Sequence, residues 1–380
     1  MQRFSNNYQI LLYKRNKIMI KSKLLIIGLI IFSSLGISAQ DAFHYTHFDM
    51  AQVALNPGLA GGFEGTARVG ALFREQDFGL VSGQYRSPIF YVDAPLIRGF
   101  RKYDWIGFGF SYQYDHQALN AIGNSVYDNA IITSTILGGL SYHFALDKKR
   151  EKVLAIGFQT GNANVYFDNS QWISPRDADE MSKNPGYEPG PHIGIAPDSK
   201  DKKNNNLGYT IGAVFTSNKT NNTQLKLGVA VSNISLTKNS RYSILKGGSG
   251  NGSYEMPLRF SAFGKYKTEL SSGLILQPKV FFQYLDPVWE ASTQVLAGMK
   301  LTKPMDMILY GGIGYNITNG LQFLISADIK DIKIVYGFDL NLSDKTAVSG
   351  AAGAFELGAS YIIKIHRKPK PDPVLLCPQI

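Results

Sequence analysis

The chain holds few residues that could combine into a catalytic or metal-binding site. Among its 380 residues it has six histidines and one cysteine. His44 and His47 are three residues apart, a spacing that can place two metal ligands on one helical turn, but no carboxylate or thiol at ligand spacing accompanies them. We therefore interpret the pair as polar residues of an N-terminal arm, and predict neither a metal site nor a cofactor.

A hydrolytic site has equally little support. Such a site needs a serine next to a histidine that an Asn or Asp orients. His143 lies on the small and polar face of a predicted strand; its pairing with a distant serine stays open, but a histidine without a catalytic role is the simpler interpretation. The run Gly311-Gly312-Ile313-Gly314 lies within a predicted strand with no helix after it, so it does not fit a phosphate loop. The sequence predicts a protein that is not an enzyme.

Bulky apolar residues alternate with small or polar ones from about residue 64 to residue 366, in segments of about ten to thirteen residues. In residues 331–342 one face reads Ile332, Ile334, Tyr336, Phe338, Leu340 and Leu342. The other face reads Asp331, Lys333, Val335, Gly337, Asp339 and Asn341. Residues 105–114 and 223–234 divide in the same way. One face suits lipid and the other water, so we expect Phe338→Arg to prevent folding and Gly337→Arg to be tolerated.

This alternation predicts an all-β fold, a transmembrane antiparallel β-barrel of about 14 strands. A soluble sandwich or barrel alternates too, but these segments match the roughly 9 to 11 residues that cross a bilayer at a tilt, and Tyr and Phe recur at their ends. The predicted strands are 64–74, 78–92, 104–115, 131–146, 152–167, 207–216, 223–234, 257–268, 273–285, 292–301, 306–316, 321–329, 331–342 and 353–365. An even count places both termini on the periplasmic side.

The connections between the predicted strands differ in length on the two sides. Most of those after even-numbered strands are short and several after odd-numbered strands are long, which fits short periplasmic turns and long outer loops. The polar segment 168–206 and the glycine-rich segment 246–253 are predicted outer loops. The long connection 93–103 and the short one at 75–77 break the trend, and are either exceptions or a miscounted hairpin.

Residues 1–39 are predicted to be a secretory signal peptide, with Met19 as an alternative start. An apolar run over residues 24–37 follows two lysines, and Ile37-Ser38-Ala39 fits a cleavage site before Gln40. Six of the 39 basic residues and none of the 29 acidic residues precede Gln40, so the formal charge of +10 falls to +4 in the mature chain. This balance gives little reason to expect a nucleic-acid partner.

The mature chain is predicted to be one domain with two short extensions. The divisions are an N-terminal arm at 40–63, the barrel at 64–366 and a C-terminal tail at 367–380. The tail holds the single cysteine, Cys377, which cannot form an internal disulfide and is either inert or a contact of the tail.

Several segments resemble the PorP/SprF family of Bacteroidetes outer-membrane proteins. Residues 41–48 and 55–62 are similar to the opening of the family. Phe73-Arg74-Glu75-Gln76 resembles its first hairpin, residues 353–358 resemble its last strand, and Cys377-Pro378 resembles its ending. Family members often carry Gln-Trp after this arginine, where this chain has Glu75-Gln76-Asp77.

The resemblance implies a non-enzymatic outer-membrane component of, or accessory to, the type IX secretion system, which exports large proteins to the cell surface. Some family members belong to the secretion and gliding machinery, and others help to export one large adhesin or hold it at the surface. The implied partners are outer-membrane lipid, a secreted protein with a type IX C-terminal domain, and other type IX secretion components.

The arm is the predicted plug or partner-binding element. Its candidate residues are Phe43, Tyr45, Phe48, Asn56, Pro57, Gly58 and Gly61. It precedes the first strand, so it either begins on the periplasmic side or folds back into the lumen, and Asn56-Pro57-Gly58 suits a tight turn. A barrel of this size could pass small solutes unless it is plugged, so an outer-membrane channel or transporter is the alternative function.

Overall fold

The computed structural model describes most of the chain between residues 45 and 365. The described residues are 45–76, 85–99, 101–118, 130–168, 183, 204–220, 223–235, 258–285, 288–301, 306–318, 320–342 and 352–365. The predicted signal peptide, the tail from residue 367, and the predicted outer loops apart from Lys183 and a few strand-end residues lie outside them. Asp41–Ile380 form one compact unit.

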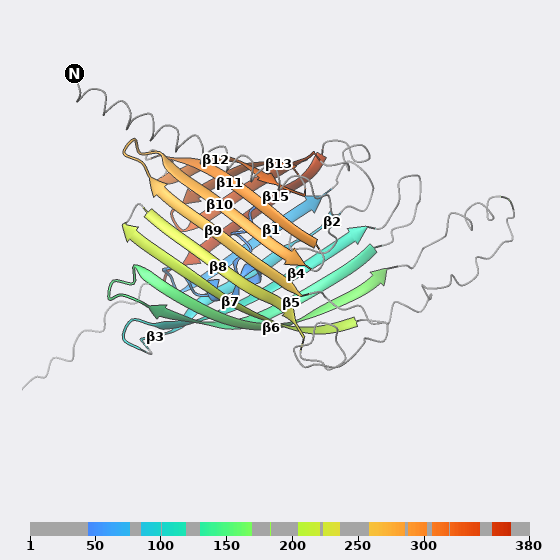
Figure 1. Ribbon diagram of the computed structural model, residues 1–380, viewed down its shortest axis with the longest axis horizontal. Helices are drawn as coiled ribbons and strands as arrows, with labels where there is room; N and C mark the ends of the chain where they lie inside the picture. Colours follow the sequence, from blue (N-terminus) through green and yellow to red (C-terminus); the bar gives the residue numbers. More distant parts are fainter. Residues whose placement is uncertain are drawn as a thin grey trace, which may run out of the picture. The chain divides into compact units, whose positions relative to one another are not determined.

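Fourteen long antiparallel strands close into a barrel, as the alternation predicts (Figure 1). They are β1 Ala67–Gln76, β3 Ile89–Arg98, β4 Trp105–Ala118, β5 Ala130–Ala145, β6 Lys152–Asp168, β7 Asn204–Thr220, β8 Thr223–Ile234, β9 Arg259–Glu269, β10 Ile275–Leu285, β11 Val288–Leu301, β12 Met307–Asn316, β13 Gly320–Ile329, β14 Ile332–Asn341 and β15 Ala352–Ile363. A two-residue strand, β2 Tyr85–Arg86, joins the rim beside β1 and β4. The barrel closes where β1 pairs with β15, from Ala67 opposite Ile363 to Gln76 opposite Ala354. Closure pairs both edges of the sheet, so the wall has no open edge among its long strands.

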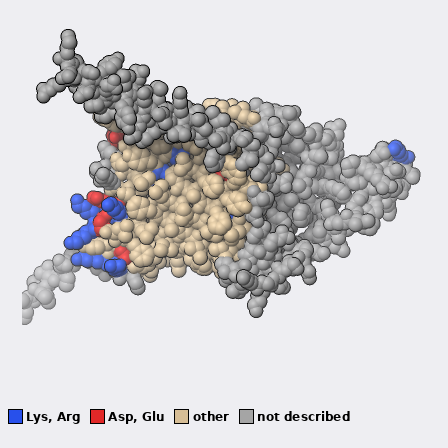
Figure 2. Space-filling view, in the orientation of Figure 1, with Lys and Arg blue, Asp and Glu red and all other residues tan. Residues whose placement is uncertain are grey.

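The outer face of the wall is apolar. Ile325, Val280 and Leu140 are each about half exposed, while alternate residues on the same strands are buried. Figure 2 shows one side of this wall with few charges across its middle, and most of the visible Lys, Arg, Asp and Glu gather at the end that carries the short turns. Among the described residues, no helix has the length and hydropathy to cross a membrane. The apolar outer face of the strands is the face that suits contact with lipid.

The second long strand lies further along the chain than the sequence predicts. The prediction was 78–92, followed by a long connection, whereas β3 runs over Ile89–Arg98 and the next connection is only 99–104. Pro95 lies within β3, and the register between β3 and β4 shifts between Pro95 and Ile97. A bulge tolerates a proline within a strand. The connection between β3 and β4 is therefore short, like the other turns at that end of the barrel. It no longer breaks the predicted pattern of short and long connections.

The arm lies inside the barrel. It forms one helical turn, α2 Gln52–Leu55, and a 3₁₀ turn, η2 Pro57–Leu59. Arm residues pack against inward residues of the wall in one apolar core. The arm side of this core is Phe48, Met50, Ala51, Ala54, Leu55 and Leu59, and the wall side is Leu72, Ile89, Ala155, Val214, Phe263, Phe281 and Val335. Figure 1 shows this blue segment behind the strands of the wall.

Inward residues of the wall face the arm and not open water. Gly337 points inward, as predicted, but a Cβ placed there would lie 3.2 Å from the ring of His47 and 3.4 Å from the methyl group of Thr46. Its neighbour is the arm and not open water. The expected tolerance of Gly337→Arg assumed a water-filled lumen, and the structure places Thr46 and His47 there instead.

The outward face can be tested by depth. Ile325 lies in the middle of β13 and Ile365 lies just beyond the end of β15, and both are exposed. Arg at the bilayer midplane costs about 2–4 kcal/mol, against about 0–1 kcal/mol near the interface. We predict that Ile325→Arg loses most of the folded band that migrates anomalously on unheated gels, whereas Ile365→Arg keeps it. Equal folding of both variants would contradict the assigned face.

Candidate functional site

The arm runs through the lumen from one end of the barrel toward the other. At one end the hydroxyl of Tyr45 donates a hydrogen bond to the carbonyl of Ser87, which precedes β3 (3.2 Å). At the other end the amide of Thr66 donates to the carbonyl of Ile363, the last residue of β15 (2.7 Å). Between these points the arm contacts inward residues from both halves of the barrel.

A cluster of buried charges holds the beginning of the arm; we call it the arginine cluster, formed by Arg74, Asp339, Glu356, Thr46 and His47. Arg74 pairs with Glu356 at 2.6 Å and with Asp339 at 2.8 Å, and all three side chains are at most 2% exposed. Both carboxylate oxygens of Glu356 accept hydrogen bonds from the arm backbone, one from the amide of Thr46 and one from that of His47 (2.9 Å). The Thr46 hydroxyl lies 2.8 Å from Asp339 and accepts from Arg74 at 2.7 Å.

The His47 imidazole is part of this anchoring. Its Nε2 lies 3.0 Å from the carbonyl oxygen of Tyr336, and its side chain is almost fully buried. Burial lowers the pKa of His47 to about 3, and the positive charge of Lys279 acts in the same direction. The ring is therefore neutral near pH 7, so it serves as a hydrogen-bonding group and not as a charge.

Asp49 is held by lysines from three strands. Its carboxylate lies 2.7 Å from the ammonium group of Lys265, 2.8 Å from that of Lys279 and 3.9 Å from that of Lys333. Burial alone would raise the pKa of Asp49, but the three lysines hold it well below the usual range. Asp49 is thus ionised, and it ties the arm to β9, β10 and β14.

The turn at Asn56-Pro57-Gly58 anchors the middle of the arm. The Asn56 side-chain oxygen accepts a hydrogen bond from the Gly58 amide at 2.8 Å, which caps the 3₁₀ turn. Its amide nitrogen donates to the carbonyl oxygens of Val229 (2.8 Å) and Ala213 (3.3 Å). One asparagine therefore shapes the turn and fixes it to β7 and β8.

The end of the arm is bound by β1, β3, β4 and β5. The amide of Gly61 donates to Asp93 at 2.7 Å, and Asp93 also pairs with Arg68 at 2.6 Å. Gly61 adopts a φ of +68°, a conformation that favours glycine. Trp105 donates from its indole nitrogen to the carbonyl of Gly61 at 2.9 Å.

His143 points into the lumen, where it lies beside Ser141. The Ser141 hydroxyl is 2.9 Å from His143 Nε2, but it donates at 2.6 Å to the carbonyl of Ala60, and Nε2 lies 2.8 Å from the same oxygen. The imidazole ring stacks on Trp105 with 4.5 Å between ring centroids. Both side chains are buried under the arm, so this serine–histidine pair binds Ala60 and is not arranged as a hydrolytic site.

Three inward glycines form a groove that admits the arm backbone. A Cβ at Gly107 would overlap the carbonyl of Ala60, one at Gly157 would overlap the backbone of Pro57, and one at Gly212 would overlap the Asn56 side chain. Any other residue at these positions would push the arm away from the wall. These glycines on β4, β6 and β7 therefore set how closely the arm can approach.

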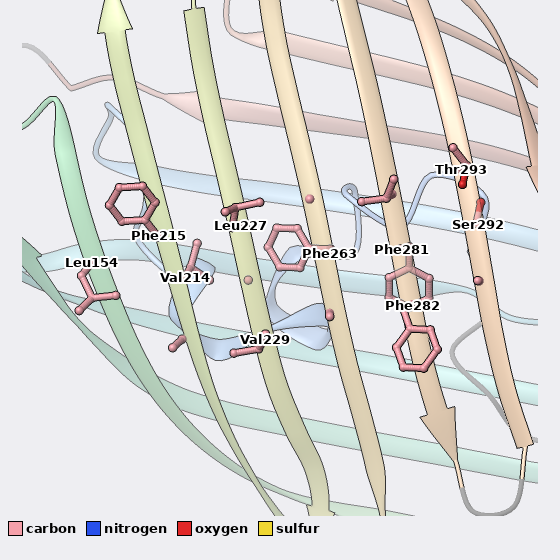
Figure 3. Close-up of a pocket in the computed structure, with 16 residues that line it drawn as sticks. Leu154, Val214, Phe215, Leu227, Val229, Phe263, Phe281, Phe282, Ser292 and Thr293 are labelled. Atoms are coloured by element: carbon pink, nitrogen blue, oxygen red, sulfur yellow. The ribbon is translucent and has the colours of Figure 1, made fainter. Parts of the chain in front are cut away.

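A hollow of about 610 Å³ is lined by residues of the neighbouring strands β6 to β11. Figure 3 shows large apolar side chains around it, including Phe215, Leu227 and Phe282. Small residues such as Ala262 and Gly264 leave the space open. No ionisable side chain lines it, so the hollow is largely apolar and has no group that could act as an acid or a base.

Six of the seven candidate residues predicted for the arm are described, and all six lie within the barrel; Phe43 lies outside the described part of the chain. Phe48 is fully buried and stacks on Phe281 with 5.1 Å between ring centroids.

Within the described ranges, no three His, Cys, Asp or Glu side chains gather into a metal-binding group. Sequence reasoning missed Thr46, Asp49 and the wall residues that bind the arm. The inward glycines carried a signal for a closely packed partner.

A family model described as type IX secretion system membrane protein PorP/SprF matches residues 37–361. The chain belongs to the PorP/SprF family. No curated protein matches the sequence. Among solved structures, the chain is similar to the toluene transporter TodX of Pseudomonas putida, with 10% identity, a TM-score of 0.48, and coverage of 84% of this chain and 94% of that one.

The toluene transporter TbuX of Ralstonia pickettii is similar at 9% identity and a TM-score of 0.45, covering 83% of this chain and 94% of that one. At these levels neither likeness carries an argument about what the present protein binds or transports.

The segments that carry the PorP/SprF resemblance meet in the arginine cluster. Thr46 and His47 come from the opening segment, Arg74 from the first hairpin segment and Glu356 from the last strand. Arg74 and Glu356 are 282 positions apart in the chain and are directly opposite across the β1–β15 closure. The cluster thus joins the arm to the closure of the barrel.

The close approach of the arm to Gly157 can be tested by adding a side chain at this position. We expect Gly157→Val to displace the arm, because the added side chain would overlap Pro57, while Gly311→Val on the outer face, with open space around it, should not. A cysteine at the buried position Ala54, with Cys377→Ser in the background, would report displacement through its reaction with a maleimide. Labelling should increase severalfold with Gly157→Val and stay at the background level with Gly311→Val. Equal labelling would show that the groove does not position the arm.

The arginine cluster predicts a large cost for losing one carboxylate. We expect Glu356→Ala to destabilise the folded barrel by about 3–5 kcal/mol, because Arg74 and two arm amides lose their partner in a buried site. The control is Glu269→Ala, which removes the partner of the half-exposed Lys300 and should cost about 0–1 kcal/mol. Urea titration of the folded band in detergent measures both. Similar midpoints for the two variants would rule out the cluster as a main source of stability.

Proposed function

We propose that this protein is a non-enzymatic outer-membrane component or accessory of the type IX secretion system, which binds a partner during the export or surface attachment of a large secreted protein. Membership of the PorP/SprF family supports a role in that system. The partner is a secreted protein with a type IX C-terminal domain, or a periplasmic part of the secretion and gliding machinery.

The occupied lumen is the observation that favours partner binding over solute passage. The arm has polar anchors along its whole described length, from Thr46 in the arginine cluster to Gly61 at Asp93. A channel for small solutes needs a continuous open path, and an anchored segment of this length opposes one. We therefore place partner recognition at the two ends of the barrel, with the arm as the segment that fills the lumen between them.

The arm's own role is tested by removing it. In cells that produce the secreted partner, we predict that deleting residues 41–60 while keeping the signal peptide leaves the barrel in the outer membrane but lowers surface display of the partner severalfold. Deleting the tail 367–380 provides the comparison, because it alters the other chain end and keeps the arm in the chain. The measurement is the surface level of the partner divided by the outer-membrane level of the barrel.

Normal display in the arm-deleted strain, at a normal level of the barrel, would contradict a role for the arm in secretion. Reduced display in both deletion strains would place the partner contact on both chain ends.

A further inference from the structure

The barrel wall gathers lysines at one place in the lumen. Lys226, Lys265 and Lys279 occupy directly opposite positions on β8, β9 and β10, so three like charges are neighbours across the strands. All three alternate with outward apolar residues and face inward. Like charges directly opposite in a sheet are destabilising unless an anion lies between them. Together with Lys333 of β14, we call this group the lysine cluster.

The wall beside the lysine cluster supplies almost no negative charge of its own. On β8, β9 and β10 the only carboxylate is Glu269, which lies at the end of β9 and pairs with Lys300. Asp328 of β13 lies 4.0 Å from Lys333. The carboxylate that meets the cluster most closely, Asp49, comes from the arm.

Asp49 does not satisfy the whole cluster. It lies within 2.8 Å of Lys265 and Lys279, but 3.9 Å from Lys333. In the part of the chain that the structure describes, Lys226 makes no ion pair or hydrogen bond. Four ammonium groups therefore share two carboxylates, Asp49 and the Asp328 that lies 4.0 Å from Lys333, and only Lys265 and Lys279 have one within 3 Å. The arginine cluster has the opposite charge balance, because one guanidinium there pairs with two carboxylates.

Part of the cluster is open to solvent. The side chains of Lys265 and Lys333 are 18% and 22% exposed, whereas that of Lys279 is 1% exposed. Lys333 is the second residue of β14 and lies close to the short turn that precedes it. The cluster can thus be reached from the end of the barrel that carries the short turns. A basic cleft with low-dielectric walls concentrates anions.

We propose that the lysine cluster binds an oxyanion, a phosphate or carboxylate group, beside Asp49 in the lumen. Ammonium groups donate charge-assisted hydrogen bonds to both kinds of oxygen. The anion takes the positions near Lys226 and Lys333 that Asp49 leaves unsatisfied. This inference does not depend on the proposed role in secretion, because it concerns the charge balance of the lumen.

The test is thermal unfolding of the full-length protein in detergent, with sodium phosphate compared with sodium chloride at equal ionic strength. We expect phosphate to raise the unfolding temperature saturably in the wild-type protein. Lys226→Gln should weaken the response about tenfold or more in phosphate concentration. Without phosphate the same variant should be at least as stable as the wild type, because it removes an unpaired charge. A lysine needed only for structure would lower stability when replaced.

Two further variants make the test specific. Lys300→Gln, at a half-exposed lysine that pairs with Glu269, should leave the response to phosphate unchanged. Asp49→Asn should strengthen the response, because the resident carboxylate no longer competes. Phosphate also stabilises proteins generally by exclusion from their surface, and that effect is the same in every variant. An equal response in the wild type and in Lys226→Gln would overturn the proposal.

A short oligoglutamate peptide, compared with an uncharged peptide of equal length, identifies the source of the oxyanion. Stabilisation by oligoglutamate that Lys226→Gln abolishes would support a site for carboxylates of an acidic peptide. Stabilisation by phosphate alone would support a site for a small free anion.

Discussion

An irregular segment inside a membrane barrel must find partners for its backbone polar groups where the wall has none to spare. The strands of the wall already use their amides and carbonyls in pairing with one another, and water is largely excluded by the arm itself. Side chains have to supply what the wall backbone cannot. Glu356 accepts two arm amides, Gln294 donates to the carbonyl of Thr46, and Ser141 donates to that of Ala60. This requirement accounts for the polar side chains at inward positions such as Glu356, Gln294 and Ser141.

The same constraint connects the arm to the integrity of the barrel. Arg74 and Glu356 stand opposite each other on the first and last strands, so the groups that bind Thr46 and His47 also lie across the closure. Arg68 and Asp93 stand opposite each other on β1 and β3, and Asp93 binds Gly61. The arm is therefore held at both edges of β1. A change that releases the arm leaves buried charges at these two junctions without some of their partners.

Much of the wall could be predicted from the sequence, because its signal is local. Alternation over residues 332–341 assigns every side chain to a face, and the structure confirms those faces. β3 lies at Ile89–Arg98 and not at 78–92, because its place is set by pairing with β1 and β4, with a bulge next to Pro95, and no local pattern records that pairing. The arm could be recognised in the sequence because its opening residues carry the family resemblance. Asn56-Pro57-Gly58 forms the expected turn.

The contacts of the arm could not be predicted in the same way. The pair Arg74 and Glu356 is 282 positions apart, and no local pattern records which strands will close the barrel. The lysine cluster is spread over four strands, and it becomes visible only once the register sets Lys226, Lys265 and Lys279 side by side. The role of Gly107, Gly157 and Gly212 could not be predicted because their partner, the arm, is a segment without regular periodicity.

The central claim is that the arm fills the lumen, and conductance in a planar lipid bilayer tests it most directly. Purified full-length protein should show no stable open-pore current steps, and a variant that lacks residues 45–60 but retains the folded band on unheated gels should show them. Open-pore steps of equal size in both proteins would contradict the account, because they would mean that ions pass the barrel whether or not the arm is present.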